Sequence, residues 1–268
     1  MQLYAKDFNF NGHNASDFNF ILCSFGTDGV SEAQNTGFNL ELITTTIPSN
    51  NRNMLSGINY SDAYVFTVTM IYNECNGSNT DKSYFSYAEV REVENWLSVS
   101  KYTKFTIDDL DFSNIYFNVI PTNIQRHKHN GNVIGWTVEF TCDSPFAWEV
   151  EEKSVSVSGT INLVLDNTSD DATTKYIFPA IHYSPTSNGT FSIVNKSDNN
   201  YTMQIDNMRQ NDDLYITDVG VITTASNLNV YNDFNKHFLR LIHGSNSLSI
   251  KGNGTIVFTM IYPRKVGM

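Results

Sequence analysis

The sequence predicts a mainly β protein: an N-terminal β-sandwich or split barrel with one α-helix and an extended hairpin, followed by a C-terminal β-sandwich. Three observations predict it. Short runs that alternate apolar and polar residues recur along the chain, and this is the period of a half-buried strand. One stretch alone has apolar residues at helical spacing. Near the middle, a strongly patterned strand ends at a proline and a charged run, which favours a domain boundary.

The strongly patterned strand lies within residues 131–148. One of its faces carries five side chains of apolar character, Ile134, Trp136, Val138, Phe140 and Cys142. The sequence Asp143-Ser144-Pro145 then stops it, because proline has no N–H to donate to a β-ladder. A charged run from Glu149 follows and predicts a surface crossing. We therefore expect one domain over residues 1–148 and a second over 149–268, with Pro145 and Trp148 at the joint.

Composition and charge narrow the class of protein. The chain has 268 residues, enough for two domains that each bury a core. Its 17 basic and 28 acidic residues give a formal net charge of -11, which repels a phosphate backbone, so we expect no specific nucleic-acid ligand. The chain has no apolar run of spanning length and begins with a polar stretch. We expect a soluble protein made in a cytoplasm, without membrane insertion.

The three cysteines are odd in number and far apart, at Cys23, Cys75 and Cys142. This spacing suits neither a disulfide framework nor a zinc cluster. Cys142 lies on the apolar face of the patterned strand, which favours buried free thiols.

The elements of the first domain follow in order. Phe8 and Phe10 alternate before an Asn11-Gly12 turn, and strands are expected at 18–23 and 36–43, the latter with Phe38, Leu40 and Leu42 inward. Residues 44–61 have no period and are expected to form a loop that is either functional or mobile. The strand at 63–72 turns Tyr64, Phe66, Val68, Met70 and Tyr72 to one side. We expect strands 36–43 and 63–72 to form a long hairpin whose tip leaves the domain.

The helix is expected at about 87–100. Ser86-Tyr-Ala-Glu89 is a capping box, in which the hydroxyl and the carboxylate satisfy N–H groups of the first turn. Beyond it an apolar stripe predicts core packing and consists of Val90, Val93, Trp96 and Leu97. Strands are expected at 103–107 and 115–120.

The second domain is expected to contain only strands. Nine short runs alternate between turn formers, at 154–157, 160–166, 176–183, 190–195, 201–206, 213–217, 219–223, 247–251 and 255–262. Regular strand spacing without a helix is typical of a β-sandwich or barrel.

Candidate chemistry is sparse. The acidic run Asp108–Asp111 suggests calcium, but it lacks the spacing and the distal Glu of a calcium loop, so a turn is favoured. His127 and His129 would share a face on a strand, yet we expect a solvated loop because Asn130-Gly131 follows. Adjacent acids such as Asp170-Asp171 and Asp212-Asp213 usually mark turns, although glycoside hydrolysis uses a carboxylate pair. We predict no catalytic residue, no metal and no cofactor, and hence no enzyme.

The order of several weak motifs resembles that of phage distal tail proteins, the Dit proteins of long-tailed phages that infect Gram-positive bacteria. In the first half these motifs are Phe8-Asn-Phe-Asn-Gly12, Asp17-Phe18, Glu94-Asn-Trp-Leu97, Trp136-Thr-Val-Glu-Phe-Thr-Cys142 and Ser144-Pro-Phe-Ala-Trp148. In the second half they are Tyr176-Ile-Phe-Pro-Ala-Ile181, Asp213-Leu-Tyr-Ile216, the stretch 238–248 and Phe258-Thr-Met-Ile-Tyr262. The resemblance spans nearly the whole chain.

This resemblance implies a virion protein of the phage tail tip, assembled in the host cytoplasm. It implies a hexameric ring that joins the tail tube to the tip or baseplate, with a galectin-like C-terminal sandwich. The implied partners are other copies of the chain, the tail tube protein, tail-tip, tail-associated lysin or baseplate proteins, and a receptor-binding protein or host saccharide. The 44–61 segment lies where an assembly arm would be, with Pro48, Asn51, Arg52, Leu55, Ile58 and Tyr60 as its candidate residues.

The alternative function is host recognition through saccharide bound by the C-terminal sandwich. Such binding needs an exposed aromatic ring over a polar groove. The candidate rings are Tyr183, Tyr201, Tyr215 and Tyr231, although alternating tyrosines are also ordinary strand packing.

Overall fold

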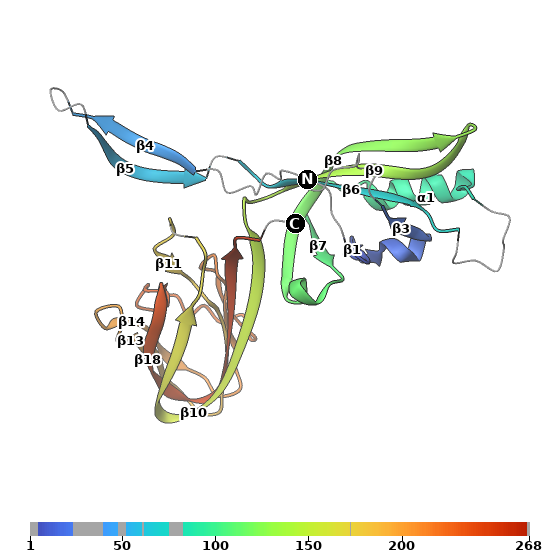
Figure 1. The fold of residues 1–268 in the computed structure, drawn as a ribbon. Helices are drawn as coiled ribbons and strands as arrows, with labels where there is room; N and C mark the ends of the chain where they lie inside the picture. Colours follow the sequence, from blue (N-terminus) through green and yellow to red (C-terminus); the bar gives the residue numbers. More distant parts are fainter. Residues whose placement is uncertain are drawn as a thin grey trace. The chain divides into compact units, whose positions relative to one another are not determined.

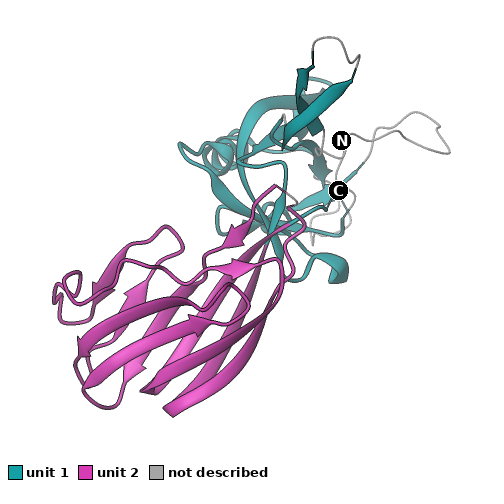
Figure 2. Ribbon diagram, turned by 90° about the vertical axis from the view of Figure 1, so that its left-hand side faces the viewer, with its two compact units in different colours: residues 1–148, 264–268 teal, residues 149–263 magenta. Residues whose placement is uncertain are grey.

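The computed structural model describes residues 5–23, 40–47, 52–60, 62–74, 83–171 and 173–266. The chain divides into two compact units, Met1–Trp148 with Arg264–Met268, and Glu149–Pro263 (Figure 2). Each unit has its own cluster of buried hydrophobic side chains. The described residues form strands in both units and one α-helix, so the predicted mainly β class is confirmed.

The first unit is an antiparallel sheet system. Its strands pair in the order β2-β1-β7-β8-β9-β6-β3 (Figure 1). Their bounds are β1 Phe8–Phe10, β2 His13–Asn14, β3 Phe20–Leu22, β6 Val65–Tyr72, β7 Thr103–Ile107, β8 Ile115–His129 and β9 Asn132–Cys142. Two short 3₁₀ helices, Ala15–Phe18 and Leu110–Phe112, complete it. The predicted turn between β1 and β2 is confirmed, since Asn11 and Gly12 both have positive φ, at 49° and 81°.

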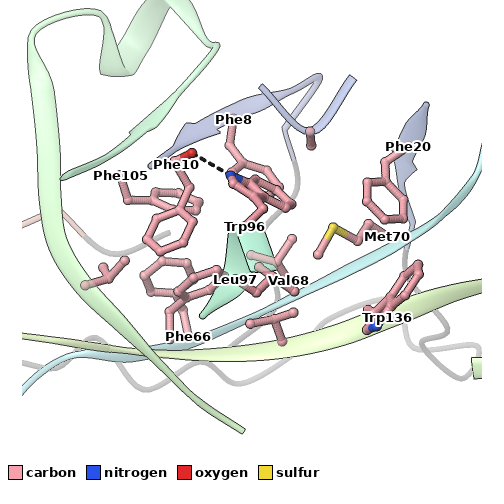
Figure 3. Close-up of a cluster of buried hydrophobic side chains, with 14 of the residues drawn as sticks. Phe8, Phe10, Phe20, Phe66, Val68, Met70, Trp96, Leu97, Phe105 and Trp136 are labelled. Atoms are coloured by element: carbon pink, nitrogen blue, oxygen red, sulfur yellow. Dashed lines mark hydrogen bonds between the residues drawn. The ribbon is translucent and has the colours of Figure 1, made fainter. Parts of the chain in front are cut away.

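Helix α1, Tyr87–Leu97, supplies part of the core of this unit. The predicted capping box is present, with the Ser86 N–H donating to the Glu89 carboxylate over 2.7 Å. Val90, Val93, Trp96 and Leu97 are buried as predicted. The Trp96 indole N–H donates to the Phe10 carbonyl at 2.7 Å, as Figure 3 shows. The helix stops at Leu97, before the expected residue 100, because Ser98 leaves helical geometry.

The strand β6 is central to the sheet. Tyr64, Phe66, Val68 and Met70 are buried, as the alternation predicts. The predicted pairing with residues 36–43 is wrong, however, because β6 lies between β3 and β9. Apolar faces decide this: Phe66, Val68 and Met70 stand opposite the buried Phe140, Val138 and Trp136 of β9.

The strand β8 is longer than the predicted 115–120. The sequence predicts a solvated loop at residues 126–129, and this is wrong, because they form the far end of β8. Their partner β9 holds them through the Asn130-Gly131 turn, where φ is 49° and 85°. Arg126 also pairs with Glu94 of α1. Polar residues thus remain in the ladder because register and cross-element contacts hold them there.

The second unit contains only strands among its described elements, as predicted. Their bounds are β10 Ala147–Asn167, which begins in the first unit, β11 Tyr176–Ile177, β12 Ala180–Pro185, β13 Gly189–Asn195, β14 Tyr201–Met208, β15 Leu214–Ile216, β16 Ile222–Thr224, β17 Leu241–Ile242 and β18 Gly244–Arg264. One pairing path runs β16-β15-β12-β18-β10, β18 also pairs with β13, which pairs with β14, and β11 pairs with β17.

Two long strands organise this unit. The runs predicted at 247–251 and 255–262 are joined in β18, which pairs with β13 through its first half and with β12 through its second. The runs at 154–157 and 160–166 are likewise joined in β10. Figure 1 shows both strands curving round at one end of the unit. Gly254 of β18 has a φ of 149°, and a Cβ there would stand 2.1 Å from the Ser184 carbonyl oxygen.

Candidate assembly hairpin and other sites

The hairpin of β4, Leu40–Thr46, and β5, Asn53–Tyr60, is a two-stranded sheet of its own. Leu40 stands opposite Tyr60 and Leu42 opposite Ile58. The register shifts between Ile43 and Thr44, so Ser56 is an extra residue on β5. The sequence predicts no regular structure over residues 44–61, and this is wrong, because most of the described residues in that range lie in β4 and β5.

The register shift gathers apolar side chains on one face. From Leu40 to Ile43, β4 faces residues 57–60, and beyond the shift Thr44 faces Leu55. Because side chains alternate along a strand, the shift returns Leu55 to the side of Leu42 and Ile58. We define the apolar face of the hairpin as Leu40, Leu42, Leu55, Ile58 and Tyr60. The opposite face carries Glu41, Ile43, Thr45, Met54 and Asn59.

The apolar face is largely uncovered. Leu40, Leu42 and Leu55 are 53%, 60% and 59% exposed. The prediction that Leu40 and Leu42 point inward is therefore wrong, and Phe38 lies outside the described residues. A lone two-stranded hairpin is marginally stable in water, so a hairpin with this face gains stability when another surface covers it.

The base of the hairpin is anchored. The Tyr60 ring meets the buried Phe146 ring edge-on at 4.7 Å between centroids. The Lys265 ammonium nitrogen lies 5.6 Å from the centroid of Tyr60 on another side. The Phe146 N–H donates to the Ser144 hydroxyl over 3.1 Å, which fixes the turn that carries it. The hairpin thus leaves from a fixed point beside the end of β9.

The predicted hairpin residues differ in position. Leu55, Ile58 and Tyr60 lie together on the apolar face. Arg52 is exposed just before β5, and its carbonyl accepts from the Ile47 N–H over 3.4 Å. Pro48 and Asn51 lie outside the described residues. Leu40 and Leu42 also belong to this face, which the sequence does not predict, because the pairing of β4 with β5 places them opposite Tyr60 and Ile58.

The predicted joint is held by one carboxylate. The side chain of Asp143 accepts from the Asn118 amide over 2.8 Å and from the Trp148 indole N–H over 3.2 Å. Residues 143–146 leave the ladder, and β10 begins at Ala147, directly after Pro145 and Phe146. Cys142 just before them is buried, and burial raises the pKa of its thiol above the ordinary value of 9.0.

Side chains of the other polar motifs form local hydrogen bonds. Asp109 accepts from the Asp111 N–H over 2.9 Å and so caps a 3₁₀ turn. Hydrogen bonds from Ser226 hold the pKa of Asp212 below its usual range. His127 Nε2 lies 2.6 Å from the Thr137 hydroxyl. In the described ranges, no three metal-ligating side chains gather as a site. No helix in those ranges is long and apolar enough to cross a membrane.

The four candidate tyrosines of the second unit are not equivalent. Tyr183 is buried at 2% exposure. The Tyr201 ring is covered by the Arg240 guanidinium at 3.8 Å and stacks with His237 at 5.1 Å. Tyr231 is 53% exposed, with the Lys236 ammonium 5.3 Å from its centroid. Tyr215 is 42% exposed.

Tyr215 lies beside two polar side chains. It stacks at 4.5 Å on the His182 ring, and His182 Nε2 is 3.0 Å from an Asp213 carboxylate oxygen. Of the four rings, Tyr215 alone is both exposed and next to a carboxylate in this way.

Comparisons with known proteins agree across the chain. Residues 3–144 match the model of a phage tail protein N-terminal domain, and residues 146–262 match that of a phage tail C-terminal domain. The solved structure of the phage SPP1 Dit protein, described as a paradigm of the hub adsorption apparatus in phages that infect Gram-positive bacteria, aligns with a TM-score of 0.66 and 14% identity. The alignment covers 96% of this chain and 98% of the other. No curated protein sequence matches significantly.

Proposed function

Because the chain belongs to the family of phage tail proteins defined by these two domains, we propose that it is a structural, non-enzymatic distal tail protein, assembled in the host cytoplasm. In this proposal six copies form a ring that joins the tail tube to the tail tip or baseplate and its receptor-binding apparatus. Residues 1–148 build the ring, residues 149–268 form a galectin-like sandwich, and Pro145 and Trp148 mark the joint. The fold shared with the SPP1 Dit protein supports the proposal.

The exposed apolar face of the hairpin is the observation that best supports this assembly. A monomer would leave three leucines more than half exposed on a sheet of two strands. Fully burying one leucine contributes about 1.5–3 kcal/mol, so a neighbouring copy that covers this face contributes several such increments. We propose Leu55, Ile58 and Tyr60 as assembly residues, together with Leu40 and Leu42. Pro48, Asn51 and Arg52 are proposed as further assembly residues from their place in the sequence.

The test is the assembly state of the purified full chain. We expect six-fold rings in negative-stain images and a matching mass by light scattering. A variant in which a Gly-Ser linker replaces residues 41–59 should remain folded by circular dichroism and should be monomeric. Normal rings from this variant would refute the role of the hairpin. A monomeric full chain at micromolar concentration would refute the ring.

Saccharide binding by the second unit is the second candidate function, and Tyr215 is the observation that favours it. An exposed ring next to His182 and Asp213 offers a stacking surface with polar groups beside it. A glycan array of bacterial surface saccharides tests this function, with Tyr215→Ala as the site variant and Tyr231→Ala as the matched control. Binding that both variants retain, or no binding at all, would exclude Tyr215 as a saccharide platform.

A further inference from the structure

The second unit has an open strand edge at β16. In its pairing path β16 comes last, and among the described strands it pairs with β15 alone. The Thr217 N–H donates to the Val221 carbonyl over 2.9 Å, and the Ala225 N–H donates to the Asp213 carbonyl over 2.8 Å. These two bonds fix which residues of β16 turn their backbone groups toward β15.

The register leaves the backbone groups of Ile222 facing outward. Hydrogen-bonded and non-hydrogen-bonded pairs alternate in an antiparallel ladder. Residues 221 and 225 bond toward β15, so Thr223, opposite Tyr215, does the same. The N–H and C=O of Ile222 therefore point away from β15, as on the edge of any unfinished sheet. An added strand would therefore form two backbone hydrogen bonds with Ile222, one that its N–H donates and one that its C=O accepts.

A groove runs along this edge. A cavity of about 390 Å³ lies between β16 and the segment 227–231, and Ile222, Thr223 and Thr224 line it. A second cavity of about 260 Å³ shares Gly220 with the first. Its lining is mostly apolar and includes Phe178, Ile181, Ile216, Phe238 and Leu239. A chain that lay along β16 would thus have an apolar side-chain pocket close to one end.

The rim of the apolar cavity is apolar and carries one acid. Val219 and Phe178, which line the cavity, are 80% and 43% exposed, and Val221, two residues beyond Val219 in the chain, is 53% exposed. Asp218, which also lines the cavity, is exposed and forms no ion pair in the part of the chain that the structure describes. A partner that covers this rim would therefore bring a cation to Asp218.

We propose that the β16 edge binds an extended segment of a different polypeptide by β-strand addition. The segment pairs its backbone with Ile222, places an apolar side chain in the cavity beside Phe178 and Phe238, and sets a lysine or arginine against Asp218. A small apolar molecule could fill the cavity but would leave the Ile222 backbone unpaired. The inference rests on the proposed hub function and names the chemistry of one partner, while using residues remote in sequence from the hairpin.

The experiment uses the full chain and an array of ten-residue peptides. Each peptide alternates threonine with apolar residues, of which one is leucine, isoleucine or phenylalanine, and one position of each peptide is lysine. The affinity of each bound peptide is then measured in solution by fluorescence anisotropy. Val219→Asn and Asp218→Lys should each weaken binding at least about tenfold. Ile222→Pro removes the outward N–H while sparing the bonds to β15, and it should abolish binding. Thr223→Ala is the matched control, because the backbone of Thr223 faces β15.

The outcomes separate the possible occupants. Peptides N-methylated at the residue opposite Ile222 should not bind; equal binding would mean that the cavity takes an apolar group without strand pairing, and would overturn the proposal. No binding by any array peptide, or binding that none of the variants changes, would also overturn it. Loss of ring assembly in Val219→Asn would identify a second copy as the occupant and refute a different polypeptide. The hairpin variants test the ring separately, so either idea can fail alone.

Discussion

Replacing two leucines on the apolar face of the hairpin tests the proposed assembly most directly. In Leu42→Asn with Leu55→Asn, both altered side chains are about three-fifths exposed, at 60% and 59%. Complete burial of a leucine contributes about 1.5–3 kcal/mol, so covering the part still exposed contributes about 1–2 kcal/mol for each. The double variant should therefore weaken each hairpin contact by about 2–4 kcal/mol. This is about thirtyfold to several hundredfold in the dissociation constant.

The assay is sedimentation velocity over a concentration series, with thermal melting measured in parallel. The double variant should shift from ring to monomer at concentrations where the parent chain is assembled. The thermal midpoint of the monomer should change little, because both leucines are exposed in the single chain.

The opposite face of the same hairpin supplies the matched control. Ile43→Asn with Met54→Asn alters side chains that are 46% and 60% exposed, on the face without the leucine cluster. This control should assemble like the parent. Equal loss of assembly in both double variants would show that hairpin stability, not the apolar face, is responsible. Intact rings from the leucine variant would refute the reasoning.

Three further changes test the first unit. In Gly135→Ala, the new Cβ would lie 2.3 Å from the Met70 carbonyl oxygen, so β6 and β9 must separate. Thermal melting should show that the free energy of unfolding falls by at least about 2 kcal/mol. The control Gly131→Ala, where φ is 85° but the space is open, should lower it by about 1 kcal/mol. Ser86→Ala removes a side-chain cap and should destabilise the unit by about 1 kcal/mol in denaturant titration, with Ser86→Thr close to the parent. The buried Cys142 thiol has a raised pKa, so iodoacetamide should modify it far more slowly in the folded chain at pH 8 than after unfolding. Because this thiol ionises at lower pH in the unfolded chain than in the folded chain, it reduces the stability of the folded chain above about pH 9, and Cys142→Ala should reduce that loss. No difference between Gly135→Ala and Gly131→Ala, an unaffected Ser86→Ala, or rapid labelling of Cys142 in the folded chain would contradict the corresponding argument.

The elements that sequence predicts well are those with one buried face. In β9 the residues Trp136, Val138, Phe140 and Cys142 are all fully buried, so selection for the core leaves a strict alternation in the sequence. Helix α1 is similar, because its cap and its apolar stripe lie in adjacent residues. An element with one buried face therefore has a clear apolar periodicity in its sequence.

The second strand of the hairpin is mispredicted for a physical reason. Its apolar residues Leu55 and Ile58 are three positions apart, which matches no strand period, because the extra residue Ser56 lies between them. Neither face is buried in the single chain, so the pattern that marks other strands is weaker here. The long strands β10 and β18 are each predicted as two runs for a different reason: the glycines at 159, 252 and 254 lie between the predicted runs, yet the structure has them inside continuous strands.

The hairpin and the β16 edge would contact a partner through different groups, so the two contacts can be tested separately. The hairpin presents side chains: its two strands satisfy each other, and its apolar face is what remains uncovered. The β16 edge presents backbone: the N–H and C=O of Ile222 face a groove, and one apolar cavity adds selectivity. Side-chain faces tolerate any complementary apolar surface, such as that of a second copy, whereas an open edge requires an extended chain. Leu42→Asn with Leu55→Asn should therefore weaken hairpin contacts and leave strand addition intact, and Ile222→Pro should do the reverse.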